Sequence, residues 1–389
     1  MASLAVAPPP TIAPASLPDF LVNRKEFLQE VALAQSVRET KTTIPVLSCL
    51  QLRADASGQL SIVGTDLDQT LHTTCSARVA RGGSVTVPAR KLFDYLRLLE
   101  GEDVAIKTLD NDRVQIRCGR SRTTMVAMSA ANFPAIPEFP EKTHARLSVH
   151  QLRSLLGRVV FAISTEESRY TLNGALMQLE PGSITLVATD GHRLAFAKVA
   201  ESVEGVTTSV EYLIALKGVR QLSALLATTK EDFVDFVSSE SSLFFRIGTR
   251  VYSVRKMMGK FPDYRAVMPK TNDKKAIVAV KDLTETLQRV GQFANDQSPS
   301  VQLSVGANQV LISSSSVESG ESEETLATTY SAEALVIGIN PSFLLDALKV
   351  LGGGEVTMEF LDPMHPIVVR PETSDNMQEF RFILMPTRR

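Results

Sequence analysis

Hydrophobic positions follow two alternating periods along the whole chain. In six segments apolar residues recur every three or four positions, as Phe27, Leu28 and Val31 do, and this spacing buries one face of a helix. We expect these helices at residues 22–38, 88–99, 148–163, 216–227, 281–293 and 340–351. Between them apolar and polar residues alternate, which is typical of strands with one buried face. Helices segregated from β-rich stretches predict an α+β fold.

The same order of helices and strands occurs three times, which indicates repeated domains. Each repeat opens with a short strand that runs into an amphipathic helix: FLVNRKEFLQEVALAQSV from Phe20, LSVHQLRSLLGRVVFAIS from Leu147 and IVAVKDLTETLQRVGQFA from Ile277. Each continues with a hairpin, a second strand–helix unit and further strands. We therefore expect three domains, each of two helices packed on antiparallel sheets, at residues 19–141, 145–268 and 274–389.

The first 18 residues, MASLAVAPPPTIAPASLP, lie outside the repeats. No basic residue precedes their apolar run and prolines interrupt it, so we expect residues 1–18 to be a disordered extension rather than a signal peptide. No stretch approaches the roughly 20 apolar residues of a membrane span. The three cysteines, Cys49, Cys75 and Cys118, lack CxxC spacing, which argues against a disulfide framework or a zinc site. A cytoplasmic protein without a membrane partner fits this composition.

Basic residues concentrate on the predicted helices. The six segments carry 13 Lys and Arg against 6 Asp and Glu, in a chain whose formal net charge is −2. Two interpretations are open: solvated helix faces are basic by chance, or the helices share one surface that faces a polyanion. No recognition helix, zinc finger or aromatic RNA-binding strand is present, so such contacts would involve phosphates and ignore base sequence. A net charge near zero predicts weak binding from bulk solution, so a firm hold on DNA needs something besides electrostatics.

The motif TDGHRL, residues 189–194, is the strongest candidate for chemistry. Asp190 and His192 lie two residues apart, as in an acid–base pair, but Asp66 occupies the equivalent place in the first repeat. A catalytic group is seldom needed twice in one scaffold, and Asp followed by Gly suits a tight turn at the end of a strand. We therefore favour a structural or binding turn, with the next strand starting at His192-Arg193-Leu194.

No other pattern indicates catalysis or a cofactor. The five histidines show no metal-ligand spacing, and the chain has no Walker A, GxSxG or GxGxxG motif. We expect no catalytic residue, no metal site and no cofactor. The alternatives are a hydrolase that uses Asp190 and His192, and a scaffold that binds partners but never DNA.

Six motifs in order carry a resemblance to a known family. IPVLSCLQL, LSIVGTDLDQTL, VTVPARKLFDYLRLL, LVATDGHRLAFAKV, KFPDYRAVMP and the terminal ILMPTRR together resemble the bacterial sliding clamps, the beta subunits of DNA polymerase III, from about Phe20 to the C-terminus. The resemblance implies a processivity factor that is not an enzyme. It also implies a head-to-tail homodimer whose clamp domains close into a ring around double-stranded DNA. Such a ring holds DNA by topology, so phosphate contacts can stay weak and the clamp can slide.

In this family a cleft between the second and third domains anchors hydrophobic peptides. They come from the DNA polymerase III catalytic subunit, the clamp loader, other DNA polymerases and repair proteins. The resemblance places this cleft at Leu172, Thr189, Gly191, His192, Arg193, Leu194, Pro262, Val267, Met364, Pro366, Ile383, Met385, Pro386, Thr387 and Arg388. Most of these residues are apolar, and a few polar ones lie at the rim, as a peptide anchor requires. Core packing is the alternative for Met364 and Met385.

The resemblance also implies DNA contacts and a subunit interface. The DNA-binding positions are Arg24, Lys41, Arg90, Tyr170, Lys217 and Arg220. The interface would bring the first domain's edge near Met125 to the third domain's helix near Phe293, which we expect to be exposed in the polar run QFANDQ. Ala266 stands where many clamps carry a second Arg, and Thr171 where some carry a second aromatic residue. The sequence leaves open whether the chain is a main replicative clamp or a specialised second copy.

Overall fold

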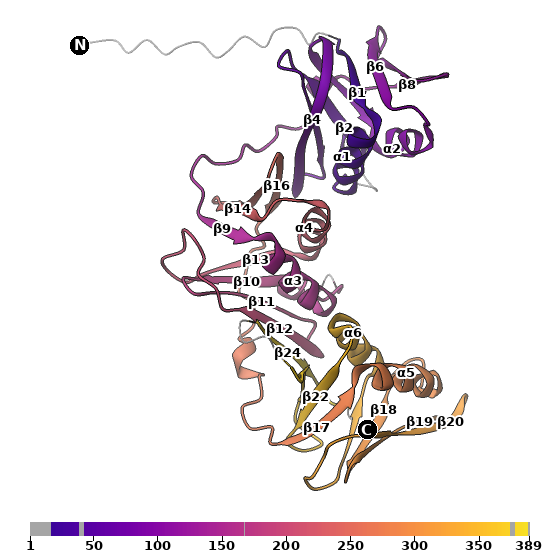
Figure 1. The fold of residues 1–389 in the computed structure, drawn as a ribbon, viewed down its shortest axis with the longest axis vertical. Coiled ribbons are helices and arrows are strands. Elements are labelled where there is room, and N and C mark those ends of the chain that lie inside the picture. The colour runs from indigo at the N-terminus through magenta and orange to yellow at the C-terminus, as the bar shows by residue number, and fades with distance from the viewer. Residues whose placement is uncertain (1–16, 39–42, 167, 374–377, 388–389) are drawn as a thin grey trace, which may run out of the picture. The chain divides into compact units, whose positions relative to one another are not determined.

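The computed structural model describes residues 17–38, 43–166, 168–373 and 378–387 (Figure 1). The described residues form two compact units: those up to Lys142 with Val234–Arg255 form the first, and Thr143–Phe233 with those from Lys256 onward form the second. Each unit therefore takes its residues from two separate stretches of the chain. The three cysteines are free and buried. No helix within the described residues is long and apolar enough to cross a membrane.

The first unit consists of antiparallel strands and two helices. Its strands follow the order β8-β7-β6-β1-β4-β16-β15-β14, and from β4 a branch leads through β3 to β2 and β5. The helices α1 (Arg24–Ser36) and α2 (Ala89–Leu98) pack against each other and against this branch. The strands are β1 (Asp19–Asn23), β2 (Cys49–Ala54), β3 (Gln59–Thr65), β4 (Gln69–Arg81), β5 (Gly83–Pro88), β6 (Asp103–Leu109), β7 (Arg113–Cys118), β8 (Ser121–Val126), β14 (Phe233–Ser238), β15 (Ser242–Ile247) and β16 (Arg250–Arg255).

Each of the six predicted helices is present, and most of them are shorter than predicted. The first begins at Arg24 because the Asn23 side chain accepts hydrogen bonds from the backbone N–H groups of Lys25 and Glu26, which caps the helix. The third and fifth helices each end in a 3₁₀ turn, Val160–Ala162 and Gly291–Phe293.

Within its described residues the second unit contains two sheets and four α-helices. Its larger sheet has the order β13-β10-β11-β12-β24-β23-β22-β17, and its smaller sheet has the order β20-β19-β18-β21. Helix α3 packs on β11 and β12, α4 on β10 and β13, α5 on β17, β19 and β20, and α6 on α5 and β24. The helices are α3 (Val149–Val159), α4 (Leu216–Thr228), α5 (Val280–Val290) and α6 (Pro341–Leu351). The strands are β9 (Ala145–Ser148), β10 (Gly174–Glu180), β11 (Ser183–Thr189), β12 (Arg193–Val199), β13 (Val210–Ala215), β17 (Lys274–Ala279), β18 (Val301–Gly306), β19 (Gln309–Ser316), β20 (Gly320–Ala327), β21 (Leu335–Ile339), β22 (Glu355–Phe360), β23 (Ile367–Pro371) and β24 (Gln378–Leu384).

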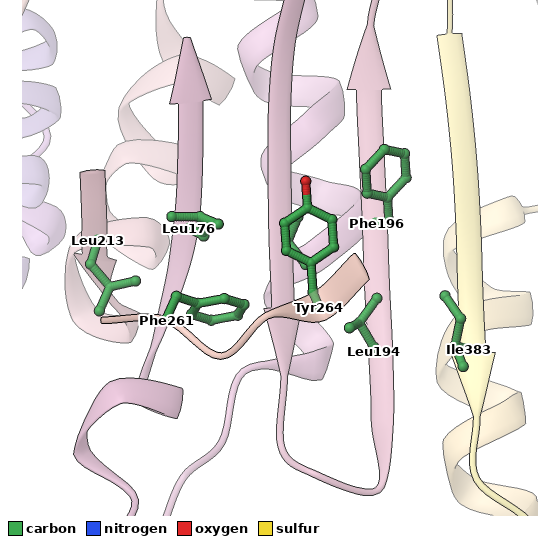
Figure 2. Close-up of a cluster of buried hydrophobic side chains, with 8 residues drawn as sticks. Leu176, Leu194, Phe196, Leu213, Phe261, Tyr264 and Ile383 are labelled. Carbon is green, nitrogen blue, oxygen red and sulfur yellow. The ribbon is translucent and has the colours of Figure 1, made fainter. Parts of the chain in front are cut away.

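The middle strands of the larger sheet are buried on both faces. Helices α3 and α4 cover one face, and residues 256–268 cross the other (Figure 2). Phe261 and Tyr264 from this crossing segment pack against Leu194 and Phe196 of β12. The Tyr264 hydroxyl donates a hydrogen bond of 2.7 Å to the side-chain oxygen of Gln178, so its buried polar end is satisfied. Burial raises the pKa of Tyr264.

A buried ion pair joins α1 to β16 in the first unit. The Arg250 guanidinium donates to both carboxylate oxygens of Glu30, at 2.6 and 3.0 Å. The Thr73 hydroxyl of β4 donates to the same carboxylate at 2.5 Å. Glu30 and Arg250 come from predicted domains 1 and 2, so the pair fixes a helix of one repeat to a strand of the next.

Replacement of Arg250 by Met should destabilise the first unit, because it leaves the Glu30 carboxylate buried without a counter-charge. We expect a loss of about 3–5 kcal/mol of unfolding free energy. The double variant Glu30→Leu/Arg250→Met should recover most of this loss, because no charge then stays buried. Urea denaturation of the full chain, followed by circular dichroism, measures both effects.

Arg255 offers a matched control on the same strand, because its ion pair with Asp68 is exposed. Arg255→Met should change the stability by at most about 1 kcal/mol. An Arg250→Met variant as stable as the wild type would contradict the role of the buried pair.

Candidate functional site

The TDGHRL motif forms a tight turn between β11 and β12. The Asp190 carboxylate accepts hydrogen bonds from the backbone N–H groups of His192 and Arg193, at 2.9 and 3.0 Å, and from the Arg193 side chain at 2.9 Å. Gly191 has a φ of +90°, which few residues other than glycine adopt readily. The Thr189 hydroxyl closes the turn with a hydrogen bond of 2.6 Å to the Arg193 carbonyl. Strand β12 begins at Arg193, one residue later than expected.

The equivalent turn of the first repeat has the same hydrogen bonds. The Asp66 carboxylate accepts from the backbone N–H groups of Asp68 and Gln69, and the Thr65 hydroxyl donates to the Gln69 carbonyl. Leu67 takes the place of Gly191 with a φ of 75°. This shared geometry confirms that the Thr-Asp turns are repeat equivalents. The Asp190 carboxylate shapes the turn and the His192 ring stacks on Phe343, so within the described residues the two side chains form no acid–base pair.

Arg193 connects the turn to two neighbouring helices. Its guanidinium donates to the Asp346 carboxylate of α6 at 2.6 Å and to the Phe161 carbonyl, just after α3, at 2.7 Å. It also lies over the Phe343 ring, 4.5 Å from the centroid. Only 11% of its side chain is exposed. Arg193 is therefore a buried connector between the second and third repeats, and it offers little surface to a ligand.

Phe343 of α6 and the C-terminal segment complete this surface. The exposed His192 ring stacks on Phe343 with a centroid distance of 6.2 Å and an interplanar angle of 23°. The Met385 backbone N–H donates to the His192 carbonyl at 3.0 Å, and the Thr387 N–H donates to the Gly338 carbonyl of β21 at 2.9 Å. The segment Met385–Thr387 thus lies between the turn and the smaller sheet.

A groove of about 1340 Å³ adjoins this segment. Four predicted cleft residues line it: Met364, Met385, Pro386 and Thr387. The rest of its lining is mostly polar and comes largely from β18, β19 and β20. Pro363 and, from β21, Val336 and Gly338 complete it. Met364 is 73% exposed, which argues against the core-packing alternative for this residue.

The loop that presents Met364 is itself a hydrogen-bonded turn. The Asp362 carboxylate accepts from the backbone N–H groups of Met364 and His365 and lies 2.8 Å from the His365 ring nitrogen Nδ1. The hydrogen bond with His365 lowers the pKa of Asp362. Pro366 is partly buried beside this turn.

The other predicted cleft residues differ in exposure. Leu194 and Ile383 are fully buried in the hydrophobic cluster of Figure 2, so they support the cleft from beneath. Leu172 and Thr189 are partly buried, and Pro262 and Val267 are exposed. Arg388 lies outside the described residues.

The sequence reasoning missed Phe343, because its helix was considered only for its apolar spacing and its charge. The available signal was its place in the first turn of the helix, two residues after Pro341, where α6 begins.

The predicted DNA-binding residues fall into three groups. Lys217 and Arg220 are exposed one turn apart on α4, and Arg90 is exposed on α2 beside Asp94. Tyr170 is 54% exposed in the loop before β10. Arg24 is partly buried, and its guanidinium donates a hydrogen bond of 2.8 Å to the Gly101 carbonyl. This bond connects α1 to the residues that follow α2. Lys41 lies outside the described residues.

The two predicted interface residues are both at least partly buried. Met125 lies on β8, the last strand of its sheet, but its side chain is buried. Phe293 is partly buried in the 3₁₀ turn after α5, so the prediction of an exposed Phe293 is wrong. The reason is that this turn continues the amphipathic helix and keeps its inner side covered. Within the described ranges no cluster of His, Cys, Asp and Glu could hold a metal ion.

Comparison with known proteins identifies the family. Three family models match consecutive parts of the chain: the N-terminal domain of the DNA polymerase III beta subunit at 19–137, its central domain at 146–263 and its C-terminal domain at 265–388. The beta sliding clamp of Escherichia coli K12 is 32% identical over 375 residues, covering 95% of this chain and 99% of the relative. That of Pseudomonas putida KT2440 is 31% identical over 370 residues, with the same coverage.

Solved structures lead to the same conclusion. The crystal structure of the Caulobacter (C. crescentus) clamp has a TM-score of 0.89 at 29% identity, with 96% of this chain and 100% of that chain covered. The Pseudomonas aeruginosa clamp has a TM-score of 0.86 at 30% identity, with 95% and 99% covered. The family consists of processivity factors for DNA replication and has no catalytic activity of its own. The chain belongs to the DNA polymerase III beta subunit family, the bacterial sliding clamps.

Proposed function

We propose that two copies of this chain close head to tail around duplex DNA. We also propose that the surface around the TDGHRL turn anchors hydrophobic peptides of replication and repair proteins. These partners are the DNA polymerase III catalytic subunit, the clamp loader, other DNA polymerases and repair proteins. The observation that carries the peptide cleft is the position of Met385–Thr387 between His192 and Gly338. This arrangement sets apolar side chains of the C-terminal segment beside an aromatic surface and an open groove.

The chemistry of this surface suits a peptide with apolar anchors. Phe343 and His192 supply stacked rings, Met364 and Met385 supply flexible apolar surface, and Arg193 lies beneath as a fixed charge. Aromatic side chains and methionines are enriched where proteins bind peptides tightly or adaptably. A related clamp from Bartonella birtlesii, 31% identical with a TM-score of 0.88, has been solved bound to griselimycin, so a clamp of this kind accepts a ligand.

Charge complementarity supports the head-to-tail dimer. Strand β8 ends one sheet of the first unit and β20 ends the smaller sheet of the second, so each has an unpaired edge. On β8 and the preceding turn, Arg120 and Arg122 are exposed, whereas Glu321 and Glu323 are exposed on β20. A basic edge that meets an acidic edge of another copy gives a heterologous contact, and such contacts form a ring when the rotation between copies closes.

The neighbours of Arg122 strengthen this argument. Arg122 lies directly opposite Arg117 in the β7–β8 ladder, and both side chains are exposed. Like charges in opposite positions disfavour a sheet, so this pair is most stable when acidic residues lie alongside. Glu321 and Glu323 of a second copy would supply them.

DNA contacts in the proposed ring are weak and independent of base sequence. The exposed pair Lys217 and Arg220 on α4, together with Arg90 on α2, would meet phosphates. Phosphate contacts position a protein without reading bases. The encircling ring, rather than these charges, would keep the clamp on DNA.

Phe343→Ala should weaken partner binding, because it removes the ring on which His192 stacks. We expect about a tenfold rise in the Kd for griselimycin, and for the tightest-binding short peptide from the polymerase III catalytic subunit of the same organism. Isothermal titration calorimetry measures both. The matched control is Phe233→Ala, which removes an exposed ring that lies against Arg146 instead of the turn. Unchanged affinity in Phe343→Ala, or an equal loss in both variants, would count against the cleft.

Charge reversal at the sheet edges should split the dimer. The variant Arg120→Glu/Arg122→Glu and the variant Glu321→Arg/Glu323→Arg should each shift the protein toward monomer, because like charges then face each other. A chain that carries all four changes should dimerise again, since the two edges have exchanged signs. Sedimentation velocity at low ionic strength distinguishes these results. A wild-type monomer, or reversed variants that stay fully dimeric, would contradict the proposed interface.

A further inference from the structure

One short segment contains both a candidate DNA contact and a candidate cleft residue. It comprises residues 164–166 and 168–173 and precedes β10; we refer to it as the connecting segment. Tyr170, which is 54% exposed, and Leu172, which is partly buried, lie two positions apart in its 3₁₀ turn, Tyr170–Leu172. A displacement of one residue would therefore move the other.

Arg169 attaches the connecting segment to the TDGHRL turn. Its guanidinium Nη1 donates a hydrogen bond of 2.7 Å to the Asp190 carbonyl, and its Nε lies 3.0 Å from the Glu166 carboxylate. The same Nη1 lies so close to Gly191 that a Cβ atom there would come within 2.7 Å of it. Glycine at 191 thus allows both the positive φ of the turn and the close approach of Arg169.

Backbone hydrogen bonds hold the two ends of the connecting segment. The Ser164 N–H donates to the Leu172 carbonyl at 3.0 Å, which closes the segment into a loop. The Leu216 N–H, at the start of α4, donates to the Asn173 carbonyl at 2.8 Å. The next residue of α4 is Lys217, another candidate DNA contact. Between these ends, Thr165, Glu166 and Ser168 are exposed, so little packing fixes the middle of the segment.

We propose that Arg169 is a positioning residue that couples DNA binding to partner binding. This inference rests on the proposed function, because it assigns Tyr170 to DNA and the turn to partner peptides. When DNA contacts Tyr170, it orders the connecting segment. Through the Arg169–Asp190 hydrogen bond this order extends to the TDGHRL turn, beneath His192. A peptide that binds to an ordered turn loses less conformational entropy, so its affinity rises when DNA is in place.

The sign of this coupling follows from the shared segment. Both ligands favour the same ordered state, so each stabilises the state that the other binds. We expect the clamp on DNA to bind the peptide about five times more tightly than the free clamp, at the lower end of usual coupling strengths. A partner would then prefer clamps that already encircle DNA.

The test compares peptide affinity with and without DNA. The clamp is loaded on nicked circular DNA by its own clamp loader and ATP, and the loader is removed by gel filtration. Fluorescence anisotropy of the labelled polymerase peptide then gives the Kd for the loaded clamp and for the free clamp. The Kd of the free clamp divided by the Kd of the loaded clamp gives a ratio, which is measured for the wild type, Arg169→Ala, Arg169→Lys and Tyr170→Ala.

In Arg169→Ala the ratio should fall from about five to about one, because the link to the Asp190 carbonyl is lost. Arg169→Lys should retain part of the ratio, because lysine can still donate to that carbonyl. In Tyr170→Ala the ratio should also fall to about one, while the free clamp keeps its peptide affinity. Arg90→Ala, which removes a candidate DNA contact on α2 of the first unit, should keep the ratio.

Three results would count against the inference. If Arg169 had only a structural role, Arg169→Ala would weaken peptide binding equally with and without DNA and leave the ratio unchanged. A wild-type ratio of one, with normal peptide binding, would overturn the coupling but not the proposed function. A wild type that binds no peptide in either state would overturn both.

Discussion

The pairing of β12 with β24 is the constraint on which the candidate cleft depends. Strand β12 follows the TDGHRL turn and β24 precedes the C-terminal residues, and the two strands form one antiparallel ladder from Arg193↔Leu384 to Val199↔Gln378. This ladder brings the His192 carbonyl within reach of the Met385 N–H. It also sets Arg193 against Asp346, 153 positions later in the chain. Without this register the turn, α6 and the C-terminal segment would share no surface.

The packing units of the protein differ from its sequence repeats. Strands β14, β15 and β16 belong to the second repeat by sequence, but they pack with the first stretch of the chain through the β4–β16 ladder and the Glu30–Arg250 pair. In the second unit, β12 and β24 likewise join strands of different repeats. Each repeat thus leaves strand edges that another repeat completes. The edges left at β8 and β20 are the ones assigned above to a second copy.

The parts of the structure that depend on local sequence could be predicted. Helix periodicity located α1 to α6, and the Thr-Asp turns at Asp66 and Asp190 proved to share their hydrogen bonds. The hydrogen bond of Arg24 could not be predicted, because its partner, the Gly101 carbonyl, lies 77 positions away; its role in DNA binding stays a prediction. Phe261 and Tyr264 belong to the motif KFPDYRAVMP. The sequence did not predict that they cover one face of the larger sheet.

Long-range contacts also determine which candidate cleft residues are buried. Leu194 and Ile383 face each other across β12 and β24, and this pairing buries them where the motif alone suggested contact surface. Phe343 was overlooked because its contact with the His192 ring joins segments that are far apart in the chain. Resemblance transferred the residues of a site, but burial and partners came from the register of strands that are far apart in the chain.

A topological measurement tests the proposed ring most directly. The protein is loaded on nicked circular DNA by its own clamp loader and ATP, passed through a sizing column at high salt, and compared with the same DNA cut once. Phosphate contacts weaken with salt on both forms of DNA. A closed ring predicts retention on the circle and loss from the cut form. Equal retention on both forms would contradict the ring and indicate ordinary electrostatic binding. Absence from both, with a loader shown to work on a known clamp, would indicate a scaffold that does not hold DNA.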